Sequence, residues 1–137
     1  MFPLSPRKSA LLAFVSGLLY WLAFAGVDIW PLAFVAFVPL LIALRDQTPK
    51  RAALFGLVCG TTMNVTGFYW LLEMLRVFSG FPTVICMVFV LIISSYQGGR
   101  LALMGWLYSR GEARGHSRNA LFTMAFAASE LAYPLLF

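Results

Sequence analysis

Three acidic side chains in otherwise apolar surroundings are the residues of this sequence that could carry chemistry. Asp28, Glu73 and Glu130 each interrupt or flank a long apolar run. An ionisable group within or beside a membrane segment is energetically costly, which makes each of these acids a candidate functional group. Each could be a catalytic group, a marker of a membrane boundary, or the partner of a base on another segment.

Each acid also has a structural explanation. Asp28 could cap a helix or mark the interface in a short polar gap. Glu73 stands three residues before Arg76, so an i,i+3 ion pair would account for both side chains. Glu130 has no charged neighbour in the sequence and needs a partner from another segment. Arg100 could be that partner if it faces inward, whereas an outward-facing Arg100 would reach the headgroups instead.

No other pattern points to an active site or a metal centre. The sequence has no phosphate-binding glycine loop, no H-E-x-x-H and no nucleophile elbow. Cys59 and Cys86 lie inside apolar runs, where a thiol is inert, and neither has metal-ligand spacing to a second cysteine or to His116. His116 lies in a basic polar loop, which favours a solvated residue. We therefore expect no catalytic residue, no metal site and no cofactor in these residues.

The elements that position these acids must sit in lipid. Of the 137 residues, 61% are hydrophobic and only 11% are charged, against about 25% charged in a typical soluble domain. The net charge of +5 comes from basic residues in short gaps between apolar runs, as in the cytoplasmic loops of membrane proteins. The composition thus predicts an integral membrane protein and argues against a nucleic-acid-binding one.

The apolar runs predict an all-α membrane protein, a polytopic bundle of about five transmembrane helices in one domain. The predicted spans are residues 10–26, 29–44, 52–75, 83–108 and 119–137. Pro39 lies inside the second span, where we expect a kink. The fifth run reaches Phe137 without a polar flank, so we expect this helix to be truncated.

A stripe of small and polar residues in the third span predicts a helix-packing surface. At helical spacing Gly56, Gly60, Asn64 and Gly67 fall along one face. Glycines at such spacing let a second helix approach closely, and Asn64 could hydrogen-bond across the contact. We expect packing, not catalysis, from these four residues.

The charges also predict an orientation. One set of alternate gaps holds nearly all the bases: Arg7, Lys8, Arg45, Lys50, Arg51, Arg110, Arg114 and Arg118. The other gaps hold Asp28, and Glu73 with Arg76. Because basic loops stay in the cytoplasm, we expect a cytoplasmic N-terminus and place Asp28, Glu73 and the outer half of the fifth helix on the far side.

Several strings, in order along the chain, carry a resemblance to a known family. They are "LAFAGVDIWPLAFVAFVPLLIAL", "TGFYWLLEMLRVFSGFP", the tyrosine Tyr96, and "SELAYPLLF" around Glu130. Together they resemble the N-terminal transmembrane portion of the apolipoprotein N-acyltransferases. The sequence departs from the family after Glu130, where it reads Leu-Ala-Tyr-Pro in place of the commoner basic residue and glycine.

The resemblance implies an enzyme of the bacterial inner membrane. Such an enzyme moves an acyl chain from a phospholipid to the N-terminal cysteine amine of a lipoprotein. In this family the chemistry belongs to a nitrilase-like domain with a Glu-Lys-Cys triad, which we do not find in this sequence. The resemblance therefore carries no catalytic residue onto this chain, and the missing domain becomes an expected partner alongside the phospholipid donor and the lipoprotein.

We therefore expect these residues to anchor an acyltransferase and to admit its lipid substrates, without activity of their own. The candidates for lipid-proximal residues are Trp70, Glu73, Arg76 and Glu130. Two other hypotheses stay open at this stage. The chain could be a small transporter or channel subunit with Glu130 and Arg100 on a polar path, or the inert product of a truncated gene.

Overall fold

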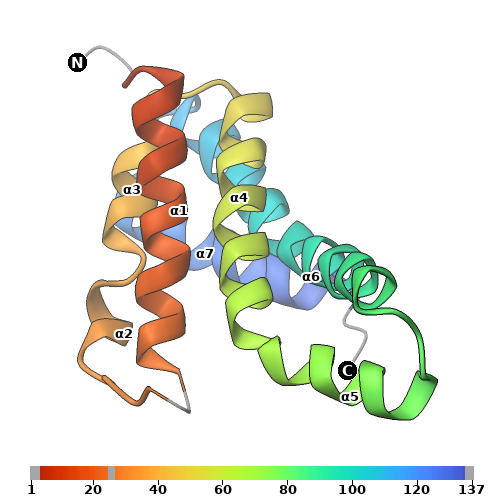
Figure 1. Ribbon diagram of the computed structural model, residues 1–137. Coiled ribbons are helices and arrows are strands. Elements are labelled where there is room, and N and C mark those ends of the chain that lie inside the picture. Colours follow the sequence, from red (N-terminus) through yellow and green to blue (C-terminus); the bar gives the residue numbers. More distant parts are fainter. Residues whose placement is uncertain (1–3, 25–26, 135–137) are drawn as a thin grey trace.

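The computed structural model describes residues 4–24 and 27–134, and these residues form helices and connecting turns without a β-strand. The predicted all-α class is confirmed. Figure 1 shows the helices in chain order: α1 (Pro6–Ala23), α2 (Leu32–Val35), α3 (Val38–Leu44), α4 (Pro49–Gly67), α5 (Tyr69–Ser79), α6 (Thr83–Glu112) and α7 (Arg118–Ala132).

Glycines bring α4 and α6 into backbone contact at the centre of the fold. A Cβ on Gly60 would lie 2.7 Å from the Cα of Gly98, and a Cβ on Gly56 would overlap the carbonyl oxygen of Leu101. Two of the four predicted packing residues thus lie directly at this contact. Asn64 is buried nearby, but its Nδ2 donates to the carbonyl oxygen of Gly60 in its own helix at 2.8 Å, not across the contact. A Cβ on Gly67 would meet no atom within 4 Å, so this glycine is outside the packed stripe.

The predicted second span is broken into α2 and α3. The break falls at Ala36 and Phe37, just before the expected site at Pro39, which occupies the first turn of α3. Proline is tolerated there because the first N–H groups of a helix have no internal acceptor. The buried hydroxyl of Ser16 on α1 donates to the carbonyl oxygen of Ala36 at 2.5 Å. A neighbouring helix therefore satisfies a backbone group at the break, as burial in an apolar environment requires.

The predicted third span, 52–75, is not one continuous helix. α4 ends at Gly67, and a new helix, α5, begins after Phe68, whose φ of −95° and ψ of 24° depart from helical values. Glycine is a poor helix former, so a helix ends there at little cost. α5 runs across one end of the bundle in Figure 1 and ends at Gly80, whose φ is 67°. Trp70, Glu73 and Arg76 therefore lie on this separate helix.

Polar contacts tie three segments together at one end of the bundle. The Ser109 hydroxyl on α6 donates to the carbonyl oxygen of Gln47 at 2.5 Å, between α3 and α4. Arg118 at the start of α7 pairs with Glu112 at 2.8 Å and with Asp46 at 3.2 Å. The described N-terminal residues join them, because Gln47 Nε2 donates to the carbonyl oxygen of Leu4 at 3.2 Å. The gaps rich in basic residues thus meet at one end, and α5 and α2 lie at the other (Figure 1).

α6 is the helix of the described residues that is long and apolar enough to cross a membrane by itself. Residues 32–44 and 120–132 form shorter apolar helices. Large apolar side chains are exposed along α5, the first half of α6 and the end of α7, with exposed fractions of 85% for Phe78 and 90% for Leu131. An apolar surface of this extent is typical of a protein that contacts lipid or other protein segments.

Candidate functional site

An ion pair between α6 and α7 is the centre of the candidate site. Nη1 of Arg100 donates to Oε2 of Glu130 at 3.2 Å, across 30 residues of sequence. The two side chains are 23% and 31% exposed, so both charges are largely withdrawn from solvent. Arg100 therefore faces inward, and Glu130 has the partner from another segment that an uncompensated acid in an apolar helix needs.

Two cavities adjoin at this arginine. One, of about 340 Å³, reaches from Arg100 to the aromatic side chains at the end of α1 and the start of α5, Trp21, Phe24 and Trp70 among them. The other, of about 310 Å³, lies between Arg100, Glu130 and the rings of Phe37 and Phe126. Tyr20, Met63 and Arg100 line both cavities. The site is therefore an aromatic space with one arginine at its middle, in the half of the bundle away from the basic end.

Some polar atoms in and around Arg100 lack hydrogen-bond partners within the part of the chain that the structure describes. Nε of Arg100, Oε1 of Gln97 and Oγ of Ser94 are buried and have no hydrogen-bond partner among the described residues. A buried N–H without an acceptor costs free energy, and native structures rarely leave one unmet. A guanidinium with a free donor edge is suited to a phosphate or carboxylate oxygen, because such charge-assisted bonds are short and directional.

Two tyrosines hold the end of α7 against α6 close to the pair. The Tyr133 hydroxyl donates to the carbonyl oxygen of Tyr96 at 2.7 Å, and the Tyr96 hydroxyl donates to that of Pro134 at 3.2 Å. Gly99 leaves room for this arrangement, since a Cβ there would overlap the Tyr133 hydroxyl. These contacts hold the end of α7, which carries Glu130, against the part of α6 that carries Arg100.

The structure brings two of the four lipid-proximal candidates to this site. Glu130 pairs with Arg100, and Trp70 lines the larger of the two cavities. Glu73 and Arg76 pair with each other at 3.0 Å on the exposed surface of α5, as their i,i+3 spacing allows, and line neither cavity. Asp28 is exposed in the turn after α1, with a left-handed φ of 60°.

Sequence reasoning did not single out the aromatic walls contributed by Tyr20, Phe37 and Phe126. The rings of Tyr20 and Phe37 lie 5.3 Å apart between centroids, and those of Phe37 and Phe126 lie 5.8 Å apart. They come from three separate segments, and aromatic residues are common throughout this chain. The sequence signal that pointed toward the site was the possible pairing of Arg100 with Glu130, which the structure shows.

This arrangement lies in a stretch of sequence that matches a known protein family. The family described as "Apolipoprotein N-acyltransferase N-terminal domain" matches residues 16–137, which include every residue lining the two cavities. The chain belongs to the apolipoprotein N-acyltransferase family. This membership favours the acyltransferase hypothesis over the transporter or channel subunit considered from the sequence.

Individual apolipoprotein N-acyltransferases show the same relationship. The chain is 31% identical over 125 residues to the apolipoprotein N-acyltransferase of Geobacter metallireducens, covering 91% of this chain and 24% of that protein. It is 34% identical over 98 residues to that of Vibrio cholerae, covering 72% of this chain and 19% of that protein. The chain therefore spans about a quarter or less of the length of these relatives.

Proposed function

We propose that residues 1–137 form the N-terminal membrane part of an apolipoprotein N-acyltransferase of the bacterial inner membrane, where they anchor the enzyme and admit its lipid substrates. The observation that carries this proposal is the Arg100–Glu130 pair in an aromatic cavity within the family-matched region. A cationic donor surrounded by aromatic rings suits the polar head and apolar chain of a phospholipid.

The proposed topology has about five crossings. α1, α2 together with α3, α4, α6 and α7 each pass between the two ends of the bundle, and amphipathic α5 lies along the outer interface. The basic end faces the cytoplasm, because cytoplasmic loops of membrane proteins carry the excess of lysine and arginine. Arg100, Glu130 and Trp70 then lie in the outer half of the bilayer.

In this placement the chain's own residues bind and orient lipid. The free Nε of Arg100 is positioned to donate to a phosphate or carbonyl oxygen, while Glu130 holds the guanidinium in place. Trp70 and the other rings of the cavity would cover an acyl chain and exclude water. Glu73 and Arg76 on α5 lie beside this path at the interface, where they contribute charge to headgroup contact.

The acyl transfer itself is proposed for the nitrilase-like domain that the family resemblance implies. A cysteine thiolate there would attack an acyl ester of the phospholipid, forming a thioester and releasing a lysophospholipid. The lipoprotein's cysteine amine would then attack the thioester, forming an amide and returning the free thiol. The phospholipid donor, the lipoprotein and that domain are thus the proposed partners of these residues. Residues 1–137 alone would show no transferase activity.

Acylation assays in a full-length enzyme carrying these residues test the proposal. Alanine variants of Trp70, Glu73, Arg76 and Glu130, together with Arg100→Gln, are expected to raise KM for the phospholipid donor. Arg51→Gln is the matched control, because Arg51 is an exposed arginine at the basic end and should leave the rate unchanged. Wild-type kinetics in all five site variants would refute the proposed role of the outer cavity.

A further inference from the structure

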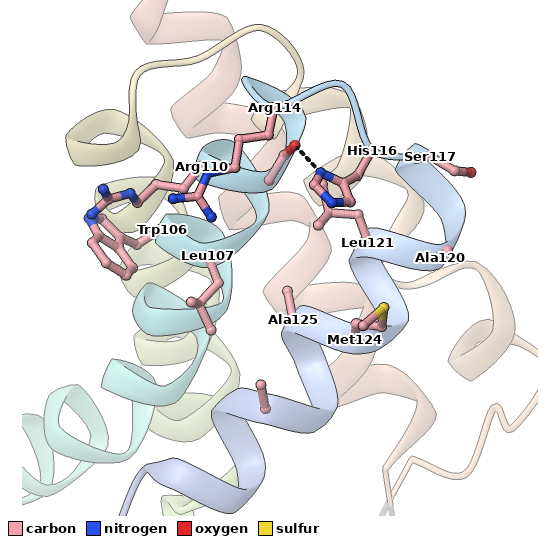
Figure 2. A pocket seen from close by; sticks show the side chains of 12 residues that line it. Trp106, Leu107, Arg110, Arg114, His116, Ser117, Ala120, Leu121, Met124 and Ala125 are labelled. Atoms are coloured by element: carbon pink, nitrogen blue, oxygen red, sulfur yellow. Dashed lines mark hydrogen bonds between the residues drawn. The ribbon is translucent and has the colours of Figure 1, made fainter.

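A second and larger groove lies at the opposite, basic end of the bundle. It has a volume of about 790 Å³ and runs between the end of α6 and α7 as far as Ala128. None of its lining residues belongs to the cavities around Arg100. Figure 2 shows its two parts: Arg110, Arg114 and His116 stand at one end, and Leu107, Leu121, Met124 and Ala125 lie along its length.

The charged end of this groove is built to receive an anion. The lining contains two arginines and a histidine and no carboxylate. Among the described residues, Arg110 and Arg114 pair with no acid, because Glu112 and Asp46 are both taken by Arg118. The Arg110 guanidinium lies 4.7 Å above the Trp106 ring, which fixes its plane and leaves its N–H edge free to donate.

The start of α7 adds to this positive end. Ser117 precedes α7 and lines the groove, and its side chain makes no capping bond to the helix. The first N–H groups of a helix have no internal acceptor and carry partial positive charge, so they favour an anion. Ser117 and Ala120 of this first turn line the same groove as Arg110 and Arg114.

The remainder of the groove is apolar and extends away from the charged end. Its α7 wall runs from Ala120 to Ala128, about 12 Å at 1.5 Å per residue. An inorganic anion would use only the arginines and leave this wall exposed. A diacyl lipid fills both parts, with its phosphate at Arg110 and Arg114 and the upper part of its chains against Leu107 and Met124.

We propose that this groove is a binding site for an anionic phospholipid, with the phosphate held by Arg110 and Arg114. Basic pockets between membrane helices at the cytoplasmic face bind the headgroups of such lipids. The site is separate from the proposed substrate cavity, and it rests on the proposed function only for the leaflet in which the lipid resides. A lipid bound there would contact both α6 and α7, the helices that carry Arg100 and Glu130.

Lipid titration of the purified 137-residue chain in detergent tests this site without any assay of acyl transfer. Phosphatidylglycerol and phosphatidylcholine with identical chains are titrated, and the dissociation constant is read from Trp fluorescence. We expect tighter binding of phosphatidylglycerol. Arg110→Gln with Arg114→Gln should weaken it roughly 25-fold, since each arginine contributes about fivefold. Arg51→Gln, which removes an exposed arginine at the same end, should retain wild-type binding.

A second pair of variants tests the apolar wall. Ala128→Trp fills the groove and should weaken binding of both lipids, whereas Ala127→Trp, on an exposed position of α7 outside the lining, should not. Equal binding of the two lipids by the wild type, or an equal loss in Arg51→Gln, overturns the site. The proposal would also be overturned if glycerol phosphate saturated the chain at the same concentration as phosphatidylglycerol, because the anion alone would then suffice for binding. Failure here leaves the acylation result at Arg100 unaffected, so the two proposals can be separated.

Discussion

Replacing Gly60 with alanine is the sharpest perturbation of the α4–α6 contact. The new Cβ would lie 2.7 Å from the Cα and the carbonyl oxygen of Gly98, where 3.4 Å or more is an ordinary contact. The two helices must therefore separate locally by about 0.7 Å, the difference between these two distances. Both neighbours are backbone atoms, so no side chain can move aside to absorb the change.

The expected loss of stability follows from overpacking. Forcing an extra methyl into a packed contact costs typically about 1–3 kcal/mol. Alanine also favours a helix by up to roughly 1 kcal/mol relative to glycine, which offsets part of this loss. Gly67→Ala is the matched control, because it is in the same helix and its Cβ would meet no atom within 4 Å. Because Gly67 is the last residue of α4, alanine gains at most as much helix propensity there as at Gly60, so the difference between the two variants is a lower bound on the overpacking cost of about 1–3 kcal/mol.

Reversible unfolding in mixed micelles, followed by circular dichroism, measures both variants. We expect Gly60→Ala to unfold at lower denaturant than Gly67→Ala, and Gly67→Ala to match or exceed the wild type. Equal stability of the two alanine variants would show that α4 and α6 do not meet through backbone at Gly60, and it would refute the packing described here.

Further predictions concern single contacts in the structure. Asp28→Val should cost about 1–2 kcal/mol of unfolding free energy, because a β-branched residue is disfavoured at a φ of 60°, whereas Asp28→Asn should be close to neutral; thermal unfolding of the pair checks this. Ser109→Ala should cost about 1 kcal/mol, since the carbonyl oxygen of Gln47 loses its donor, and an unchanged midpoint would contradict that bond. A double-mutant cycle on Arg100→Gln and Glu130→Gln should give a coupling free energy of about 1–2 kcal/mol, between the values for exposed and buried pairs, and additive losses would show that the charges do not interact.

Much of the helical architecture follows from local features of the sequence. Apolar run length and the positions of glycine and proline predict the helical class and the contact at Gly56 and Gly60. The division at Phe68 was not predictable in this way, because the apolar pattern continues from α4 into α5 without a proline or a polar gap. The break between α4 and α5 depends on tertiary packing, because α5 lies across the end of the bundle and not along its axis (Figure 1).

The candidate site was only half visible in the sequence. Glu130 stood out because an acid without a nearby base needs a partner elsewhere, and Arg100 was one of few bases within a span. Which way Arg100 faces depends on the rotation of α6 about its axis. The spacing of apolar residues does not fix this rotation, because apolar residues occur on all sides of the helix. The cavity walls depend on three segments meeting, and no local pattern reports such a meeting.

Cysteine labelling in intact cells tests most directly the central claim that these residues cross the inner membrane with their basic end in the cytoplasm. Cys59 and Cys86 are first replaced by alanine, and single cysteines are introduced at exposed positions of either end, Thr48 and His116 at the basic end, Ile29 and Phe81 at the other. With a membrane-impermeant maleimide added outside, we predict labelling of Ile29→Cys and Phe81→Cys, and labelling of Thr48→Cys and His116→Cys only after the inner membrane is permeabilised. The same labelling at both ends, or labelling of the basic end alone, would contradict the account.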